Sequence, residues 1–107
     1  MQTVTAPTFR AHIVDAVLDR LAGRAVARFA KRVSSEHLRA AMVDLRGTSV
    51  ITSEGWAALV SAVTHLFDEG REVSLLGSQR LQGLFELSTL TRKARLVMFG
   101  QGLLRSE

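Results

Sequence analysis

The fold of this chain is decided by residues 41–56, which read AMVDLRGTSVITSEGW. The stretch begins with a short apolar segment at residues 42–45 that is interrupted only by Asp44, the pattern of a strand covered on both faces. A brief loop follows, and the Asp44 side chain is expected to cap or bond it. Two hydroxyl residues then stand directly before a helical pattern, where helix-capping residues are common. A strand, a loop and the start of a helix therefore follow one another directly.

The same kinds of signal continue on both sides of this stretch. Alternating apolar residues predict a half-buried strand within residues 8–18, and apolar residues three and four apart predict a helix from residue 22 to Ser34 and Ser35. Helical spacing returns at residues 55–68, and Gly70 stands where a left-handed C-terminal cap is wanted. Further along lie a buried-type strand at 73–76, a helix face of Leu81, Leu84, Phe85 and Ser88, and a last strand at 94–99.

This order of elements predicts the fold class. Two strand–helix–strand crossovers between residues 42 and 99 are nearly always right-handed, and they make neighbouring strands parallel. With the N-terminal strand added, we expect an α/β fold whose small mixed, mostly parallel β-sheet has helices packed against it. The length of 107 residues suits one domain, residues 1–107, with its core at about residues 9–99.

Composition excludes several classes of protein. With 47% apolar residues, 22% charged residues and one proline, the chain reads as globular. It has no cysteine for a disulfide, a thiolate metal site or a nucleophile, and His12, His37 and His65 lack metal-ligand spacing. We therefore expect no metal, no cofactor and no catalytic residues. No apolar run approaches the roughly 20 residues of a membrane span. Residues 1–7 lack the basic start and apolar core of a signal peptide, so we expect a cytoplasmic protein.

The positive charge is concentrated in one segment. The net charge is +4, and six of the 14 cations lie between Arg20 and Arg39. Such a surface could meet nucleic acid, anionic lipid or an acidic protein. A nucleic-acid binder using Arg24, Arg28 and Arg32 is unfavoured, because no aromatic residues are interleaved with these cations. A solvated helix face is the simpler interpretation.

Residues 41–56 resemble the signature of a STAS domain, the module of anti-sigma-factor antagonists. That family shows an apolar strand ending in Asp-Leu, a short loop, and then Asp-Ser-Ser-Gly-Leu opening a helix, with a serine or threonine phosphorylated as a switch. The corresponding residues here, 52–56, read TSEGW. Residues 70–90 match the spacing of the family's second pattern, so the resemblance covers about residues 9–99 and implies a STAS-like fold. The terminal elements that are usual in the family look shortened.

The resemblance makes Ser53 and Thr52 the candidate phosphorylation sites. In one branch of the family the acceptor directly precedes the glycine, a position held here by Glu54, and in the stress-signalling branch it lies one residue earlier, at Ser53. Thr52 replaces an aspartate and could cap the helix or accept phosphate. Ser53 has two interpretations, a phosphoacceptor or an N-cap that accepts from the N–H of Gly55 or Trp56.

The neighbouring residues also have two interpretations each. Glu54 either mimics a phosphate or simply suits the positive end of the helix. Trp56 either completes the core stripe or anchors a partner, and Gly55 permits close backbone approach. Together Ser53, Glu54, Gly55 and Trp56 form the expected partner-binding site.

The implied function is that of a bacterial, non-catalytic regulator of transcription. By resemblance, its partner is a serine kinase that doubles as an anti-sigma factor, and a PP2C-like, metal-dependent serine/threonine phosphatase resets the switch. The alternative is a STAS adaptor subunit of a bacterial ABC-type lipid-transport complex, which docks onto the transporter ATPase without phospho-regulation.

Overall fold

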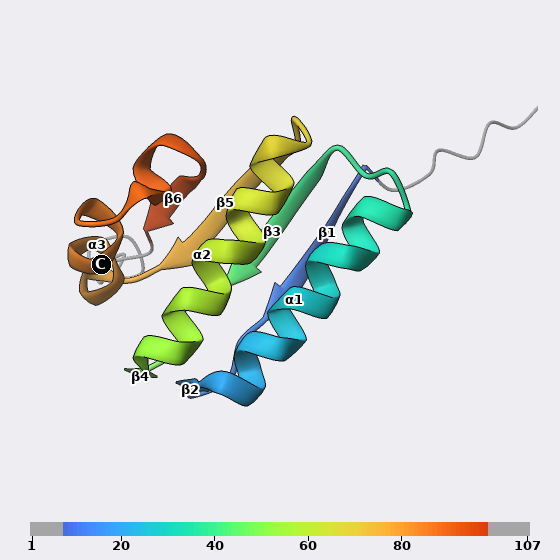
Figure 1. Ribbon diagram of the computed structural model, residues 1–107. Coiled ribbons are helices and arrows are strands. Elements are labelled where there is room, and N and C mark those ends of the chain that lie inside the picture. Colours follow the sequence, from blue (N-terminus) through green and yellow to red (C-terminus); the bar gives the residue numbers. More distant parts are fainter. Residues whose placement is uncertain (1–7, 99–107) are drawn as a thin grey trace, which may run out of the picture.

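The computed structural model describes residues 8–98, which form two parallel sheets and three α-helices (Figure 1). In chain order the elements are β1 (Phe9–Ile13), β2 (Val17–Leu18), α1 (Arg20–Ser35), β3 (Ala40–Asp44), β4 (Val50–Ile51), α2 (Ser53–Asp68), β5 (Glu72–Gly77), α3 (Gln79–Glu86), the 3₁₀-helix η1 (Thr89–Arg92) and β6 (Arg95–Met98). Phe99, the end of the predicted last strand, lies outside the described residues.

The larger sheet has the strand order β1-β3-β5-β6, and each neighbouring pair is parallel. The predicted α/β class with a mostly parallel sheet is confirmed. The short strands β2 and β4 form a second parallel pair, in which Val17 is registered with Val50 and Leu18 with Ile51. All the described pairings are thus parallel, including that of the N-terminal strand.

The single strand predicted within residues 8–18 is wrong, because the chain makes two strands that belong to different sheets. The N–H of Val14 donates to the carbonyl of Asp44 at 2.9 Å, and this is the last hydrogen bond between the β1 segment and β3. Two residues later the carbonyl of Ala16 accepts from Ser49 and Val50 instead. Alternation of side chains along one strand cannot reveal this change of partner.

The helix ends follow local chemistry. Helix α1 starts before its apolar stripe because the Asp19 side chain accepts from the N–H of Ala22 at 3.0 Å. Helix α2 ends at Asp68, and Gly70, two residues further on, has a φ of 80° in the left-handed region, as predicted. The N–H groups of Gly70 and Arg71 donate to Phe67 and Leu66 at 2.9 and 3.0 Å, which is the Schellman arrangement.

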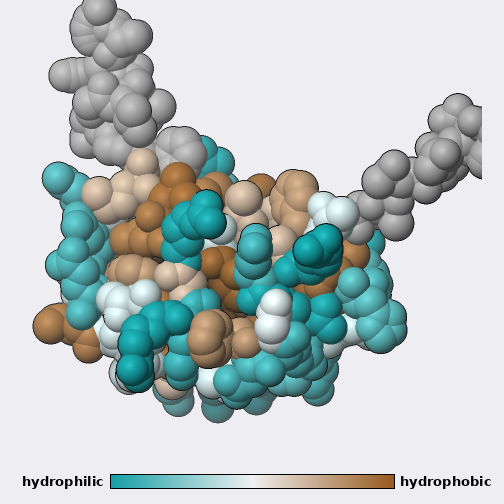
Figure 2. Space-filling model, turned by 90° about the horizontal axis from the view of Figure 1, so that it is seen from above, coloured by the Kyte–Doolittle hydropathy of each residue, from teal (hydrophilic) through white to brown (hydrophobic). Residues whose placement is uncertain are grey.

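Helices α1 and α2 lie side by side across one face of the larger sheet (Figure 1). The core lies between these two layers, and the largest side chains that are fully buried there are Leu18, Leu59, Leu66, Leu75, Leu90, Val26, Val33, Val43 and Val63. The space-filling view shows mostly hydrophilic surface on the helix side and more apolar surface on the sheet side (Figure 2). None of the helices within residues 8–98 combines the length and apolar character needed to cross a membrane.

The third helical stripe is partly as predicted. Leu81 and Phe85 are buried, whereas Leu84 is 40% exposed. Ser88 lies beyond α3 and caps η1, where its hydroxyl accepts from the N–H of Leu90 at 3.1 Å. Helix α3 therefore ends before the stripe does, and Leu84 faces a surface cavity instead of the core.

Candidate functional site

Arg46 binds the carboxylate of Asp44 at the point where the chain leaves the sheet. One carboxylate oxygen of Asp44 accepts from the backbone N–H and Nε of Arg46, each at 3.0 Å, and the other accepts from Nη2 at 2.8 Å. The Asp44 side chain is nearly buried, and the hydrogen bonds from the Arg46 side chain hold the pKa of Asp44 below its ordinary value. The prediction that Asp44 bonds the following loop is confirmed.

The loop that follows is bonded along its length to residues 15–18. The Thr48 hydroxyl donates to the carbonyl of Asp15 at 2.8 Å, and the N–H groups of Ser49 and Thr52 donate to Ala16 and Leu18 at 2.8 and 3.0 Å. These bonds join segments more than thirty residues apart. They place the start of α2 beside the start of α1.

Thr52 caps α2. Its hydroxyl accepts from the N–H of Gly55 at 3.0 Å and donates to the carbonyl of Leu18 at 3.4 Å. The backbone of Thr52 is extended, with φ −86° and ψ 162°, as an N-cap requires. The prediction that Ser53 is the N-cap is therefore wrong, and the alternative given for Thr52 is correct. Helix α2 begins at Ser53, before the helical spacing that was predicted from residue 55.

Ser53 and Glu54 are both exposed on the first turn of α2. Within residues 8–98, neither side chain takes part in a hydrogen bond or an ion pair. The Ser53 hydroxyl thus stands unengaged at the positive end of a helix of 16 residues. Glu54 is the acidic residue of that first turn, a place that the helix dipole favours.

Gly55 has a packing role. A Cβ atom there would overlap the carbonyl group of Leu18 and would lie 2.9 Å from the nitrogen of Asp19. At the same crossing, a Cβ atom on Gly23 would lie 2.6 Å from the Cβ of Ala58. The absence of side chains at Gly23 and Gly55 lets α1 and α2 approach closely at their N-terminal ends. Gly55 is buried, so its contribution to a docking surface is to hold that surface in place.

Trp56 is half-buried and packs against the core. The predicted contact with the core is present, and the interpretation of Trp56 as a partner anchor stays a prediction.

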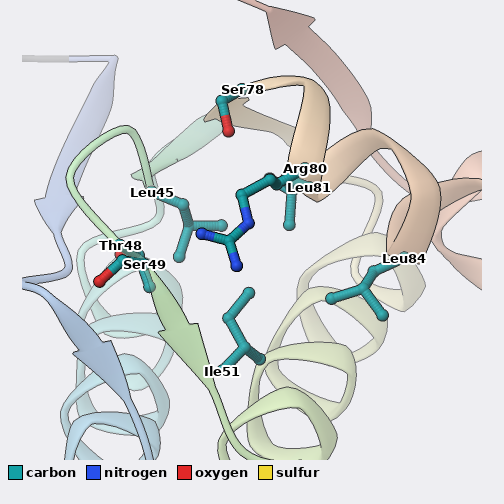
Figure 3. Close-up of a pocket in the computed structure, with 8 residues that line it drawn as sticks. All are labelled: Leu45, Thr48, Ser49, Ile51, Ser78, Arg80, Leu81 and Leu84. Carbon is teal, nitrogen blue, oxygen red and sulfur yellow. The ribbon is translucent and has the colours of Figure 1, made fainter.

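A cavity of about 190 Å³ separates the loop from α3 (Figure 3). Its lining comes from both sides, and the residues are Leu45, Thr48, Ser49, Ile51, Ser78, Arg80, Leu81 and Leu84. The Arg80 guanidinium extends across it toward Leu45 and Ile51 (Figure 3). Arg80 has no ion pair in the part of the chain that the structure describes. Sequence reasoning missed Arg80, because nothing local to it indicates that it reaches the loop.

Exposed apolar side chains flank the loop on both sides. Val17 and Val50, which are registered on the small sheet, are 40% and 50% exposed. Leu84 at the cavity rim is 40% exposed, and Leu87 at the end of α3 is 90% exposed. Exposed apolar side chains beside a polar loop give a partner both apolar area and hydrogen-bonding groups to contact. We call this region, formed by Val17, residues 48–54, Arg80, Leu84 and Leu87, the loop surface.

Comparison with protein-family models and with curated proteins gives no match. Among residues 8–98, no three histidine, aspartate or glutamate side chains gather closely enough to hold a metal ion. The case for a function therefore rests on the geometry of the loop surface and on the resemblance of residues 41–56.

Proposed function

We propose that this chain is a non-catalytic STAS-type regulator, similar to an anti-sigma-factor antagonist, that docks a protein partner on the loop surface. Phosphorylation of Ser53 is the proposed switch. The observation that carries this proposal is the exposed, unengaged hydroxyl of Ser53 on the first residue of α2, next to a cap that Thr52 supplies.

Ser53 is a better candidate for the phosphoacceptor than Thr52, because only the Thr52 hydroxyl is already hydrogen-bonded within the described residues. The Thr52 hydroxyl is half-buried and has both a donor and an acceptor role, so a phosphate there would remove the cap of α2. A phosphate on Ser53 would leave those bonds intact. It would place about two negative charges beside the free N–H groups of the first helical turn, which tolerate anions.

The same phosphate would oppose docking. A partner that covers Val17, Val50 and the neutral Ser53 hydroxyl would have to desolvate a dianion once Ser53 is modified. Phosphorylation would leave the domain folded and would prevent the partner from binding, and a reversible switch requires both. In this proposal the partner is a serine kinase that also acts as an anti-sigma factor, a serine/threonine phosphatase removes the phosphate, and the protein works in the cytoplasm.

The test is affinity purification of the tagged protein from its native cells, with mass-spectrometric mapping of phosphate on Thr52 and Ser53. The purified kinase is then titrated against wild type, Ser53→Ala, Ser53→Asp and Ser61→Ala. Ser61 is an exposed serine further along α2, and it serves as the matched control. We expect Ser53→Asp to weaken binding at least about tenfold, or roughly 1.4 kcal/mol, and the other variants to bind as wild type does.

If wild type, Ser53→Ala and Ser53→Asp bind the kinase equally well, the proposed phosphorylation switch at Ser53 is wrong. Recovery of a transporter ATPase, with both hydroxyls unmodified, would instead support the adaptor subunit of a lipid-transport complex. In that case the loop surface would still be the docking site, and Ser53→Asp would weaken binding to the ATPase.

A further inference from the structure

Strand β1 is the outer strand of the larger sheet. The order β1-β3-β5-β6 places β3 on one side of it, and among residues 8–98 no strand lies on the other (Figure 1). An edge strand presents unpaired backbone groups that can pair with another chain. This edge lies on the far side of β1 from β3 and is distinct from the loop surface.

The hydrogen-bond pattern identifies which groups face outward. The carbonyl of Thr8 accepts from Ala40, and the N–H of Val14 donates to Asp44. In a parallel pair, alternate residues of a strand bond to the same neighbour. The even-numbered residues of this segment therefore bond to β3. The N–H and C=O groups of residues 9, 11 and 13 point to the open edge.

The two faces of this edge differ in chemistry. On one face Phe9 and Ile13 are 49% and 70% exposed. On the other, β1 lies against α1, and a groove of about 280 Å³ runs between them. Its lining residues are Arg10, Ala11, His12, Ala25, Arg28, Phe29 and Arg32.

The charge of the groove is mostly uncompensated. Arg10 is paired with Glu36, with 2.7 Å between Nε and Oε1. Arg28 and Arg32 are exposed, and neither has a carboxylate partner within the described part of the chain. A chain lying along this edge would meet two free guanidinium groups on one side and two apolar side chains on the other.

We propose that the outer edge of β1 binds an extended acidic segment of a partner protein, which adds a strand to the sheet. Successive side chains of a strand point to opposite faces, so the bound segment alternates acidic and apolar residues. Its carboxylates lie toward Arg28 and Arg32, and its apolar residues cover Phe9 and Ile13. A second copy of this chain fits poorly, because pairing β1 with itself would bring Arg28 and Arg32 of two copies together.

The probe is a blocked, fluorescent peptide that alternates glutamate and valine, with a peptide of the same composition in blocks as its control. Binding is followed by anisotropy, and the amides of Ala11 and Ile13 are followed by hydrogen exchange. We expect the alternating peptide to bind more tightly than the block peptide and to slow exchange at both amides.

Two sets of variants separate the backbone from the charges. Ala11→Pro removes an outward N–H and no bond to β3, a position where an edge strand tolerates proline, and it should abolish binding. Arg28→Glu with Arg32→Glu should weaken binding at least about tenfold. Arg20→Glu with Arg24→Glu is the matched control, because it makes the same charge change on α1 outside the groove. It should weaken binding less than about threefold.

Three results would overturn the proposal. The first is wild-type binding of the peptide by a folded Ala11→Pro variant or by the double variant Arg28→Glu, Arg32→Glu. The second is a wild-type dimer in sedimentation that Ala11→Pro converts to monomer, which would make the edge a self-association site. The third is binding of an oligonucleotide with steep salt dependence and no binding of the peptide, which would assign the groove to nucleic acid.

Discussion

Gly55 and Leu18 are in backbone contact, although thirty-six residues separate them in the chain, and a Cβ atom at Gly55 would overlap the carbonyl group of Leu18. The same carbonyl accepts from the N–H of Thr52 at 3.0 Å. The start of α2 is thereby held against the end of β2. This contact decides where the Ser53 hydroxyl stands.

Gly55→Ala should lower the free energy of unfolding by about 2 kcal/mol, because the added methyl group must displace backbone instead of a flexible side chain. Urea unfolding followed by circular dichroism measures the change. Gly83→Ala in α3 is the control, since nothing lies within 4 Å of the added Cβ. It should stabilise by up to about 1 kcal/mol. Equal stability of Gly55→Ala and wild type would contradict the close contact.

Thr52→Ala should destabilise the protein by about 1 kcal/mol, because it removes the cap that the Gly55 N–H uses. Ser53→Ala should change stability by less than about 0.5 kcal/mol, since its hydroxyl has no bond within the described residues. Chemical unfolding of both variants beside Thr52→Ser, which keeps a capping hydroxyl, decides the assignment. If Ser53→Ala destabilises the protein more than Thr52→Ala does, Ser53 and not Thr52 is the N-cap.

Stability should fall in acid in a manner that depends on Asp44. The hydrogen bonds from Arg46 lower the pKa of Asp44 in the folded protein from its ordinary value of 3.8. The charged form is therefore favoured by folding, and its stabilisation is present above the ordinary value and lost as the pH falls through the lowered one. Unfolding free energies from about pH 6 to pH 3 should fall less steeply for Asp44→Asn than for wild type.

Asp68→Asn is the control for this pH dependence. Asp68 is an exposed carboxylate without an ion pair among residues 8–98, and its variant should follow wild type. Some acid dependence should remain in Asp44→Asn, because hydrogen bonds from Ser34 and Arg71 also lower the pKa of Glu69. An Asp44→Asn profile that superimposes on wild type would show that the Arg46 bonds persist on unfolding or do not form.

Trp56→Ala should lower the free energy of unfolding by about 2 kcal/mol, because the half-buried ring packs against the core. Leu87→Ala, at a side chain that is 90% exposed, should change it by less than about 0.5 kcal/mol. Thermal and urea unfolding of the two variants provide the comparison. Little effect at Trp56 would mean that its ring serves a partner instead of the core.

Sequence patterns predicted correctly those features that depend only on residues close together in the chain. The apolar stripe of α1 and the left-handed conformation of Gly70 depend on residues within a few positions of one another, and both were predicted correctly. The parallel pairing of the strands from residue 42 onward followed from crossover rules that need only the order of the elements. The bond between Asp44 and the loop could also be predicted, since its partner Arg46 is two residues away.

The errors lie where a distant segment intervenes. Thr52 displaced Ser53 as the cap while its hydroxyl also bonds to Leu18, which no local pattern reveals. The strand predicted within residues 8–18 breaks because Val14 and Ala16 bond to different partners. Arg80 joined the site from α3 without any signal near it in the chain.

By itself, the sequence determined the three helices, the parallel order of the strands from residue 42 onward and the short list of hydroxyls that could act at the start of α2. Hydrophobic periodicity and glycine conformation are properties of neighbouring residues, so they can be read along the chain. Only the tertiary structure decided that Thr52 caps the helix while Ser53 stays unengaged, that Gly55 fits against Leu18, and that the edge of β1 is open beside Arg28 and Arg32. Each of these depends on which distant segments meet, and that is settled by packing the core.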